Sequence, residues 1–191
     1  MSDAWPAWAT QEVEISAPDR AWENQAAELS ADLERRLARW LDGRVEHVGS
    51  TAVPGLAAKP VIDLMAPVHA LVDSERADEV LSEAGWHLVP PELDQRPWRR
   101  MYVLPEGDRR LAHLHLVEPT HPQWCDVLLF RDQLRLHPEL AATYERIKRL
   151  AARAHPGDRE AYTAAKSAFV QQVIRTGVHR SAQRRISTQD E

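Results

Sequence analysis

The chain has 191 residues, a formal net charge of −5 at pH 7 and one cysteine, Cys125. This length fits a single domain, the acidic balance argues against a broad nucleic-acid-binding face, and one cysteine excludes an internal disulfide framework. The N-terminus lacks a basic segment followed by an apolar run, and no stretch approaches the length of a membrane span, so we expect a cytoplasmic protein without membrane or nucleic-acid partners.

The hydrophobic pattern in chain order predicts an α+β domain, with a mixed sheet in the first two thirds and helices packed after it. The predicted strands are 13–15, 45–48, 61–65, 86–89, 99–104 and 110–117, the last two joined as a hairpin. The predicted helices are 20–41, 75–84, 123–136, 138–154 and 158–176, with Gly177 ending the last. We expect one domain over 13–177, with a core at 13–118, C-terminal helices at 119–177, and flexible termini at 1–12 and 178–191.

The strongest chemical signal joins a Gly-Ser pair to a carboxylate. Gly49 and Ser50 follow the strand 45–48, and Asp63 lies inside the apolar run 61–65. A glycine at a strand end lets a phosphate approach the backbone, and the serine beside it can donate its N–H and hydroxyl to an anionic oxygen. A carboxylate on a neighbouring strand can hold a divalent cation against that phosphate. The alternative is that Asp63 is structural and hydrogen-bonded to loop amides.

A second candidate ligand set lies on the strand 110–117. Strand alternation puts His113 and His115 on one face, where two imidazoles can converge on a single ion. Beside Asp63 they would complete a set of two histidines and one carboxylate, which suits Mn, Fe, Ni or Zn better than Mg²⁺. The pair could instead hydrogen-bond loop carbonyls or face water. His47 is a weaker candidate.

Four cations are candidates for contacting an anionic ligand. They are Lys59 in the rigid loop 52–60, Arg131 and Arg135 within the apolar arc of helix 123–136, and Lys166 within the apolar stripe of the last helix. Arginine suits bidentate phosphate contact, and lysine acts as a point charge. The alternatives are that these long side chains snorkel to water, or that Asp132 and Glu139 neutralise the arginines.

Residues 47–63 resemble the signature of the GrpB family. The likeness extends to residues 113–117, 129–139 and 158–166, so it covers most of the chain, from about Val13 to Ile174. The resemblance implies a fold similar to that of nucleotidyltransferases, whose core pattern is Gly-Ser, a gap, and then two acids two residues apart. Relatives of this family also occur fused to some dephospho-CoA kinases.

The chain departs from the nucleotidyltransferase pattern at one position. The residue two beyond Asp63 is Met65, not an acid. Nucleotidyl transfer normally uses paired carboxylates to hold two Mg²⁺ ions, so the loss of one argues against conventional two-metal transfer. A second acid from elsewhere would restore the pair, and Glu118 is the nearest candidate in sequence to the histidine strand.

The leading hypothesis is a metal-dependent enzyme that transfers a nucleotidyl group, or performs related chemistry, on a phosphorylated small molecule. It makes Asp63 and Ser50 catalytic, with a divalent Mg, Mn or Zn ion held by Asp63, His113 and His115, and a nucleoside triphosphate as substrate. The residues expected to bind that substrate are Gly49, Ser50, Thr51, Lys59, Arg131, Arg135 and Lys166. The alternatives are a non-catalytic ligand-binding or accessory module of the same fold, and a metal-dependent hydrolase that uses the histidine pair.

Overall fold

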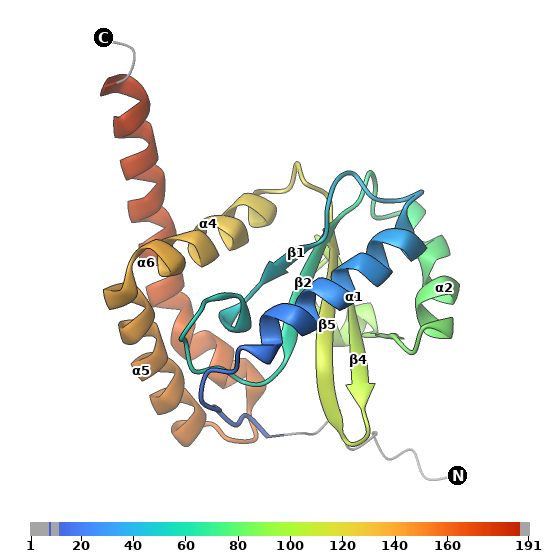
Figure 1. Ribbon diagram of the computed structural model, residues 1–191, viewed down its shortest axis with the longest axis horizontal. Coiled ribbons are helices and arrows are strands. Elements are labelled where there is room, and N and C mark those ends of the chain that lie inside the picture. The colour runs from blue at the N-terminus through green and yellow to red at the C-terminus, as the bar shows by residue number, and fades with distance from the viewer. Residues whose placement is uncertain (1–7, 9–11, 188–191) are drawn as a thin grey trace.

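A five-stranded mixed sheet lies at the centre of the protein. The structure, a computed structural model, describes Trp8 and residues 12–187 (Figure 1). The strands are β1 (Glu46–Val48), β2 (Ile62–Pro67), β3 (His87–Leu88), β4 (Arg99–Glu106) and β5 (Arg109–Val117), in the spatial order β1-β2-β5-β4-β3. β2 and β5 run parallel, and the other neighbouring pairs are antiparallel. The pairing of β2 with β5 is what brings distant parts of the chain together.

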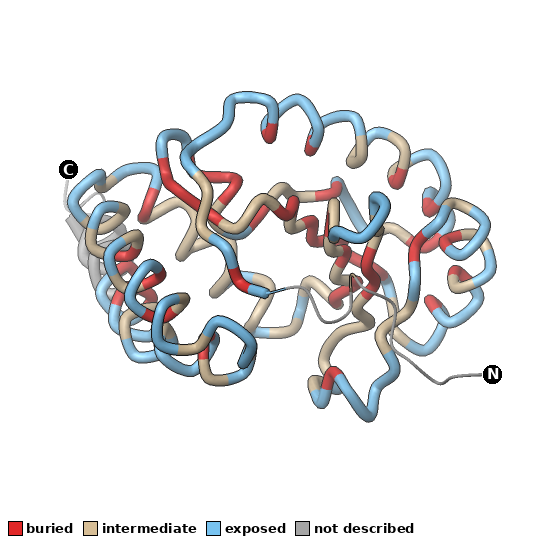
Figure 2. Tube along the Cα trace, turned by 90° about the horizontal axis from the view of Figure 1, so that it is seen from below, coloured by how far each residue is buried: buried red, intermediate tan, exposed pale blue. Residues whose placement is uncertain are grey.

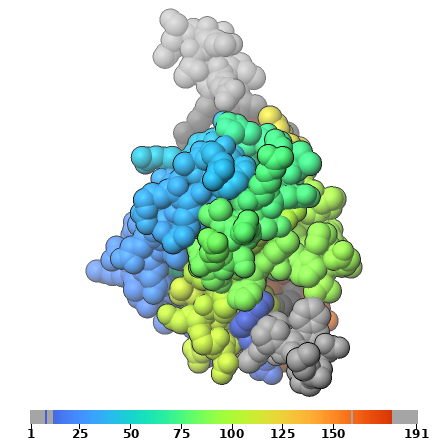
Figure 3. All heavy atoms as spheres, turned by 90° about the vertical axis from the view of Figure 1, so that its right-hand side faces the viewer, coloured from blue at the N-terminus to red at the C-terminus, as the bar shows by residue number. Residues whose placement is uncertain are grey.

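Helices cover both faces of this sheet. They are α1 (Ala21–Leu37), α2 (Ala77–Glu83), α3 (Pro91–Asp94), α4 (Pro122–Leu136), α5 (Pro138–Ala154) and α6 (Arg159–Ser187), with 3₁₀ turns η2 (Ser50–Ala52) and η3 (Asp73–Arg76). α1 crosses one face of the sheet, with α2 beside it (Figures 1 and 3). The helices α4, α5 and α6 pack against one another on the other side (Figure 1).

The main core fills the space between α1, α2 and one face of the sheet. The buried side chains of α1, among them Leu33 and Leu37, recur three or four positions apart and meet Leu64, Leu114 and Leu116 of β2 and β5. Each fully buried leucine contributes about 1.5–3 kcal/mol relative to an exposed one. Figure 2 shows buried residues gathered along the sheet and on the inner sides of the helices. Because strand side chains alternate, the neighbours of these leucines face the opposite side, where the helices α4 to α6 lie.

The α+β prediction is confirmed, and each predicted strand and helix overlaps an observed one except the strand 13–15, which is wrong, because the only strand pairing beside it in the described structure is an isolated bridge between Ser16 and Ala58. The predicted end of the last helix at Gly177 is wrong, because α6 continues to Ser187. A Cβ at Gly177 would lie 3.2 Å from side-chain atoms of both Leu129 and Gln133, so this glycine allows α6 to approach α4 closely. The expected flexible tail is therefore helical as far as 187, and residues 188–191 and most of 1–12 lie outside the described residues. Among the helices described, none is long and apolar enough to cross a membrane.

Candidate functional site

A cavity of about 1050 Å³ lies on the face of the sheet that α1 leaves open. β2, β4 and β5 form its floor, and α6 closes it with Tyr162, Thr163 and Lys166. The predicted site residues that line this cavity are Gly49, Ser50, Thr51, Lys59, Asp63, His113, His115 and Lys166. The fold therefore brings most of the predicted site together in one place.

Asp63 lies at the centre of the cavity floor. Its strand, β2, places it opposite Val48 of β1 and opposite His113 of β5. The Nδ1 atom of His113 lies 2.9 Å from its Oδ1 atom. Burial acts to raise the pKa of Asp63, but the hydrogen bond from His113 and the nearby charges, Lys59 among them, outweigh it and lower the pKa to about 2. Asp63 is therefore ionised at neutral pH and accepts the hydrogen bond that His113 donates.

Gly49 lies directly against this carboxylate. Its backbone has φ 71° and ψ −166°, a combination that residues other than glycine essentially never adopt. A Cβ at this position would lie 2.3 Å from the Oδ2 atom of Asp63. The sequence analysis expected a phosphate to approach the backbone at this glycine. In the structure, the Asp63 side chain makes this close approach.

The two histidines and Asp63 form a cluster with metal-ligand chemistry. One ligand atom from each of Asp63, His113 and His115 lies within 4.8 Å of the others. The Nε2 atom of His113 is buried and has no hydrogen-bond partner among the described residues, which is unusual for a native imidazole. Two imidazoles and one carboxylate, with an orphaned nitrogen among them, fit a divalent transition-metal ion. This set is the candidate metal site.

His115 is neutral in this arrangement. Burial lowers its pKa to about 3, and the positive charge of Arg99 acts in the same direction. An Nη1 atom of Arg99 lies 3.1 Å from the Nδ1 atom of His115. His115 is opposite Met65 in β2, so an imidazole stands beside the position where an acid is missing.

The hydroxyl groups of the turn after β1 are engaged within the protein. Thr51 is buried, donates to the carbonyl oxygen of Val61 at 3.4 Å and lies 3.0 Å from the Nε2 atom of His47. Ser50 is hydrogen-bonded to Tyr144 of α5. Burial lowers the pKa of His47 to about 4, which leaves it neutral and bound to Thr51 rather than to the cluster.

Two lysines approach from the helical side. The Nζ atom of Lys166 lies 3.9 Å from the ring centroid of Tyr162, and burial lowers its pKa to about 8 against the raising effect of Asp63. Lys148 of α5, which sequence reasoning missed, is 1% exposed and donates to the carbonyl oxygen of Ala57. Burial, reinforced by the charge of Lys166, lowers the pKa of Lys148 to about 7. Of the two, Lys166 lines the cavity and, with a pKa of about 8, stays mostly protonated at neutral pH, as an anion-binding site requires, whereas the described cavity lining does not include Lys148.

Arg131 and Arg135 both contact the sheet region, although the Arg135 side chain is 40% exposed, and the described cavity lining does not include either of them. Arg131 donates to Glu46 at 2.6 Å and to the carbonyl oxygen of His47 at 3.0 Å. Arg135 donates to the carbonyl oxygen of Ala52 at 2.8 Å. Both arginines thus dock α4 on β1 and on the turn η2, and the fold does not bring them to the remaining site residues.

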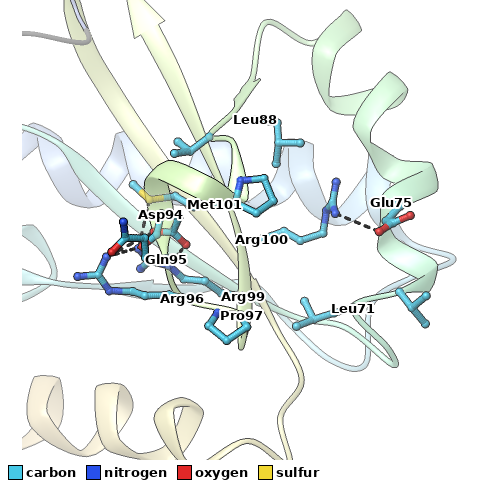
Figure 4. A pocket seen from close by; sticks show the side chains of 13 residues that line it. Leu71, Glu75, Leu88, Asp94, Gln95, Arg96, Pro97, Arg99, Arg100 and Met101 are labelled. Carbon is cyan, nitrogen blue, oxygen red and sulfur yellow. Dashed lines mark hydrogen bonds and ion pairs between the residues drawn. The ribbon is translucent and has the colours of Figure 1, made fainter.

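Sequence reasoning missed the pair formed by Asp94 and Arg99. Asp94 ends α3, is 6% exposed, and accepts from the Nε and Nη2 atoms of Arg99 at 2.9 and 2.5 Å (Figure 4). The pair separates the main cavity from a smaller one of about 450 Å³. Glu118, the expected source of a second acid, accepts instead from the backbone N–H of Leu71. Asp94 is a second buried acid beside the cavity, but its charge is already paired with Arg99.

The fold and the site define an α+β protein whose cavity joins a carboxylate–histidine cluster to a Gly-Ser turn. The chain belongs to the GrpB protein family, which matches residues 12–176. It is 38% identical over 165 residues to the UPF0157 protein PA4798 of Pseudomonas aeruginosa, covering 85% of this chain and 66% of that protein.

Two further comparisons agree with this placement. The crystal structure of GrpB from Enterococcus faecalis superimposes with a TM-score of 0.77 at 28% identity, covering 88% of this chain and 99% of that one. A dephospho-CoA kinase of Mycolicibacterium paratuberculosis is 30% identical over 186 residues, covering 85% of this chain but 45% of the kinase. The chain thus spans about two thirds of one of these curated relatives and under half of the other.

Proposed function

We propose that this protein is a metal-dependent enzyme of the nucleotidyltransferase type that acts on a phosphorylated small molecule. The observation that carries the proposal is the convergence of Asp63, His113 and His115 with the Gly49-Ser50 turn in one cavity. A divalent cation bound by this cluster would neutralise charge on a phosphate oxygen and orient the phosphorus for attack. The ionised state of Asp63 supports this role, because a ligand carboxylate must be deprotonated.

The charges around the cluster favour an anionic substrate. Lys59 and Lys166 line the same cavity as Asp63 and would offset the charge of a triphosphate. Small-molecule sites usually measure about 300–1000 Å³, so a cavity of about 1050 Å³ can hold a nucleoside triphosphate and part of an acceptor. A nucleoside triphosphate is therefore the proposed substrate, in a cytoplasmic protein that needs neither nucleic acid nor a membrane.

A second candidate function is a ligand-binding or accessory module without catalysis. It is favoured by Met65, which is 2% exposed and packs in an apolar cluster with Val48 and Val117 at the position of the missing acid. The match to part of a dephospho-CoA kinase is consistent with such a role. Release of pyrophosphate separates the two functions, because an accessory module would bind nucleotide and release none.

A thermal-shift screen tests the proposal. We expect a nucleoside triphosphate together with Mg²⁺ or Mn²⁺ to raise the melting temperature more than the nucleotide or the metal alone. A ligand at about 100 times its dissociation constant adds roughly 2.7 kcal/mol, which corresponds to about 5–10 °C for a protein of this size. Inorganic sulfate at equal ionic strength is the control for general anion binding. If no combination of nucleotide and metal exceeds sulfate, the proposed function is wrong.

A further inference from the structure

The two residues before Lys59 are hydrogen-bonded on both sides of the chain. Ala58 pairs with Ser16 in an isolated antiparallel bridge, in which the N–H of each residue donates to the carbonyl oxygen of the other at 3.1 and 2.8 Å. Ala57 directs its own N–H and carbonyl oxygen toward α5. This short segment therefore has the environment of a central strand, with Ser16 on one side and a helix on the other.

Two side chains of α5 take the place of a partner strand. The Oε2 atom of Glu145 accepts from the N–H of Ala57 at 3.3 Å, and the Nζ atom of Lys148 donates to the carbonyl oxygen of Ala57 at 2.5 Å. Glu145 and Lys148 lie three residues apart, so they share one face of the helix. Figure 1 shows the loop between η2 and β2 running beside α5. The helix thus fixes the backbone two residues before Lys59.

The same turn of α5 also holds the Gly-Ser turn. Tyr144 is hydrogen-bonded to Ser50, and its ring packs against Phe130 and Phe169. Consecutive residues of α5 therefore reach the turn that contains Ser50 and the segment that leads to Lys59. Both segments belong to the proposed triphosphate site, so one turn of α5 sets their relative position.

Packing alone does not account for a lysine at position 148. This side chain is 1% exposed, and removing an amine from water is costly. A methionine has a similar length and would fill the same space without that cost. The amine can donate to the carbonyl oxygen of Ala57 whether or not it is charged, so the contact does not depend on its protonation. A buried polar group that is hydrogen-bonded in this way makes the surrounding structure rigid.

We propose that Lys148 is a positioning residue that holds Lys59 in the triphosphate-binding part of the cavity, through the backbone of Ala57. The inference rests on the proposed function. Lys148 is not in the described lining of the main cavity, whereas Lys59 is, so Lys148 acts through Lys59. Asp63 lies on β2 and does not depend on this contact. Loss of Lys148 should therefore weaken triphosphate binding and leave metal binding unchanged.

The experiment measures two affinities by titration calorimetry, that for Mn²⁺ alone and that for α,β-methylene-ATP in the presence of Mn²⁺. We expect Lys148→Met to weaken binding of the nucleotide analogue by about 10-fold, since a charged hydrogen bond is worth about 10–100-fold in affinity. The affinity for Mn²⁺ should not change. Arg146→Met is the matched control, because Arg146 is exposed on α5 and the change in charge is the same. This variant should keep both affinities.

A double-mutant cycle tests whether Lys148 acts through Lys59. We expect Lys59→Met/Lys148→Met to bind the analogue no more weakly than Lys59→Met alone, because the contact with Ala57 has no further effect once Lys59 is gone. If the two single effects multiply in the double variant, the proposed route through Lys59 is wrong. A lower melting temperature with an unchanged affinity of the folded protein would show a purely structural role and would also overturn the inference.

Hydrogen exchange reports on the same contact without any nucleotide. We expect the backbone amides of residues 56–59 to exchange faster in Lys148→Met than in the unaltered chain or in Arg146→Met. If Lys148→Met does not fold, Lys148→Gln replaces it with the same expectations, since glutamine keeps a donor on a shorter side chain. Unchanged exchange and unchanged affinity would overturn the inference and leave the proposed function intact. Failure of the unaltered chain to bind the analogue with Mn²⁺ would overturn the proposed function, and the inference with it.

Discussion

Replacing Asp63 with asparagine is expected to abolish the rise in melting temperature that a divalent cation produces. Asparagine keeps the size of the side chain but loses the negative charge that a hard cation requires. The metal-free protein should also lose about 1–3 kcal/mol of unfolding free energy, because the charged hydrogen bond from His113 becomes a neutral one. Differential scanning calorimetry with and without Mn²⁺ measures both effects.

Asp78→Asn provides the control for this prediction. Asp78 accepts from Arg100 and from the hydroxyl of Tyr102, so it too holds buried partners, but it does not belong to the described lining of the main cavity. Its variant should lose stability and keep the whole metal-induced shift. If Asp63→Asn also kept that shift, Asp63 would not be a ligand, and the enzymatic interpretation would lose its main support.

Replacing Gly49 with alanine is expected to be one of the most destabilising single changes in the cavity. The backbone there is in a region that only glycine populates readily, and the new methyl group would meet the Asp63 carboxylate. Strain and overpacking each cost about 1–3 kcal/mol, so we expect a total of about 2–6 kcal/mol, or a fall of roughly 4–24 °C in melting temperature. Thermal and urea unfolding measure it.

Gly55→Ala separates backbone strain from the contact with Asp63. Gly55 also has a positive φ, 76°, but nothing lies within 4 Å of a Cβ placed there. This variant should cost about 1–2 kcal/mol and leave metal binding unchanged. Gly49→Ala should lose metal binding as well, because Asp63 has to move. Equal effects of the two alanines on stability and on metal binding would contradict the role given to Gly49.

The candidate cluster could be predicted from sequence to a large extent, because it depends on local rules. An acid inside an apolar run must find a partner, and strand alternation places His113 and His115 on one face. The sequence could not show that β2 and β5 pair in parallel, since they lie far apart in the chain and are not consecutive strands. That pairing is what puts Asp63 opposite His113, and only the fold supplies it.

Arg99 could have been found by the same alternation rule. In the register of β4 with β5, Met101 is opposite His115 and Val103 is opposite His113, so Arg99 two residues earlier lies on the same face. Its partner Asp94 could not have been found this way, because α3 is a four-residue helix with no hydrophobic period. The short segment between β3 and β4 thus holds the part of the site that sequence patterns leave out.

The arginines of α4 have partners that a helical pattern cannot predict. Arg131 and Arg135 reach from α4 to β1 and to the turn η2, as their positions in the apolar arc indicated, but their partners there are backbone carbonyls and Glu46. A helical pattern tells which side a residue faces and not what it meets there. Lys148 is the converse case: it lies four positions after the buried Tyr144, on the same face of α5, and is itself buried although it is a lysine.

The most direct test is diffraction from crystals soaked with Mn²⁺ and a non-hydrolysable nucleoside triphosphate, recorded at the manganese absorption edge. The account predicts an anomalous peak about 2.1 Å from a carboxylate oxygen of Asp63. It also predicts triphosphate density between the Gly49-Ser50 turn and Lys166. Manganese and nucleotide bound together at another place, with Asp63 still held by His113 alone, would contradict the account.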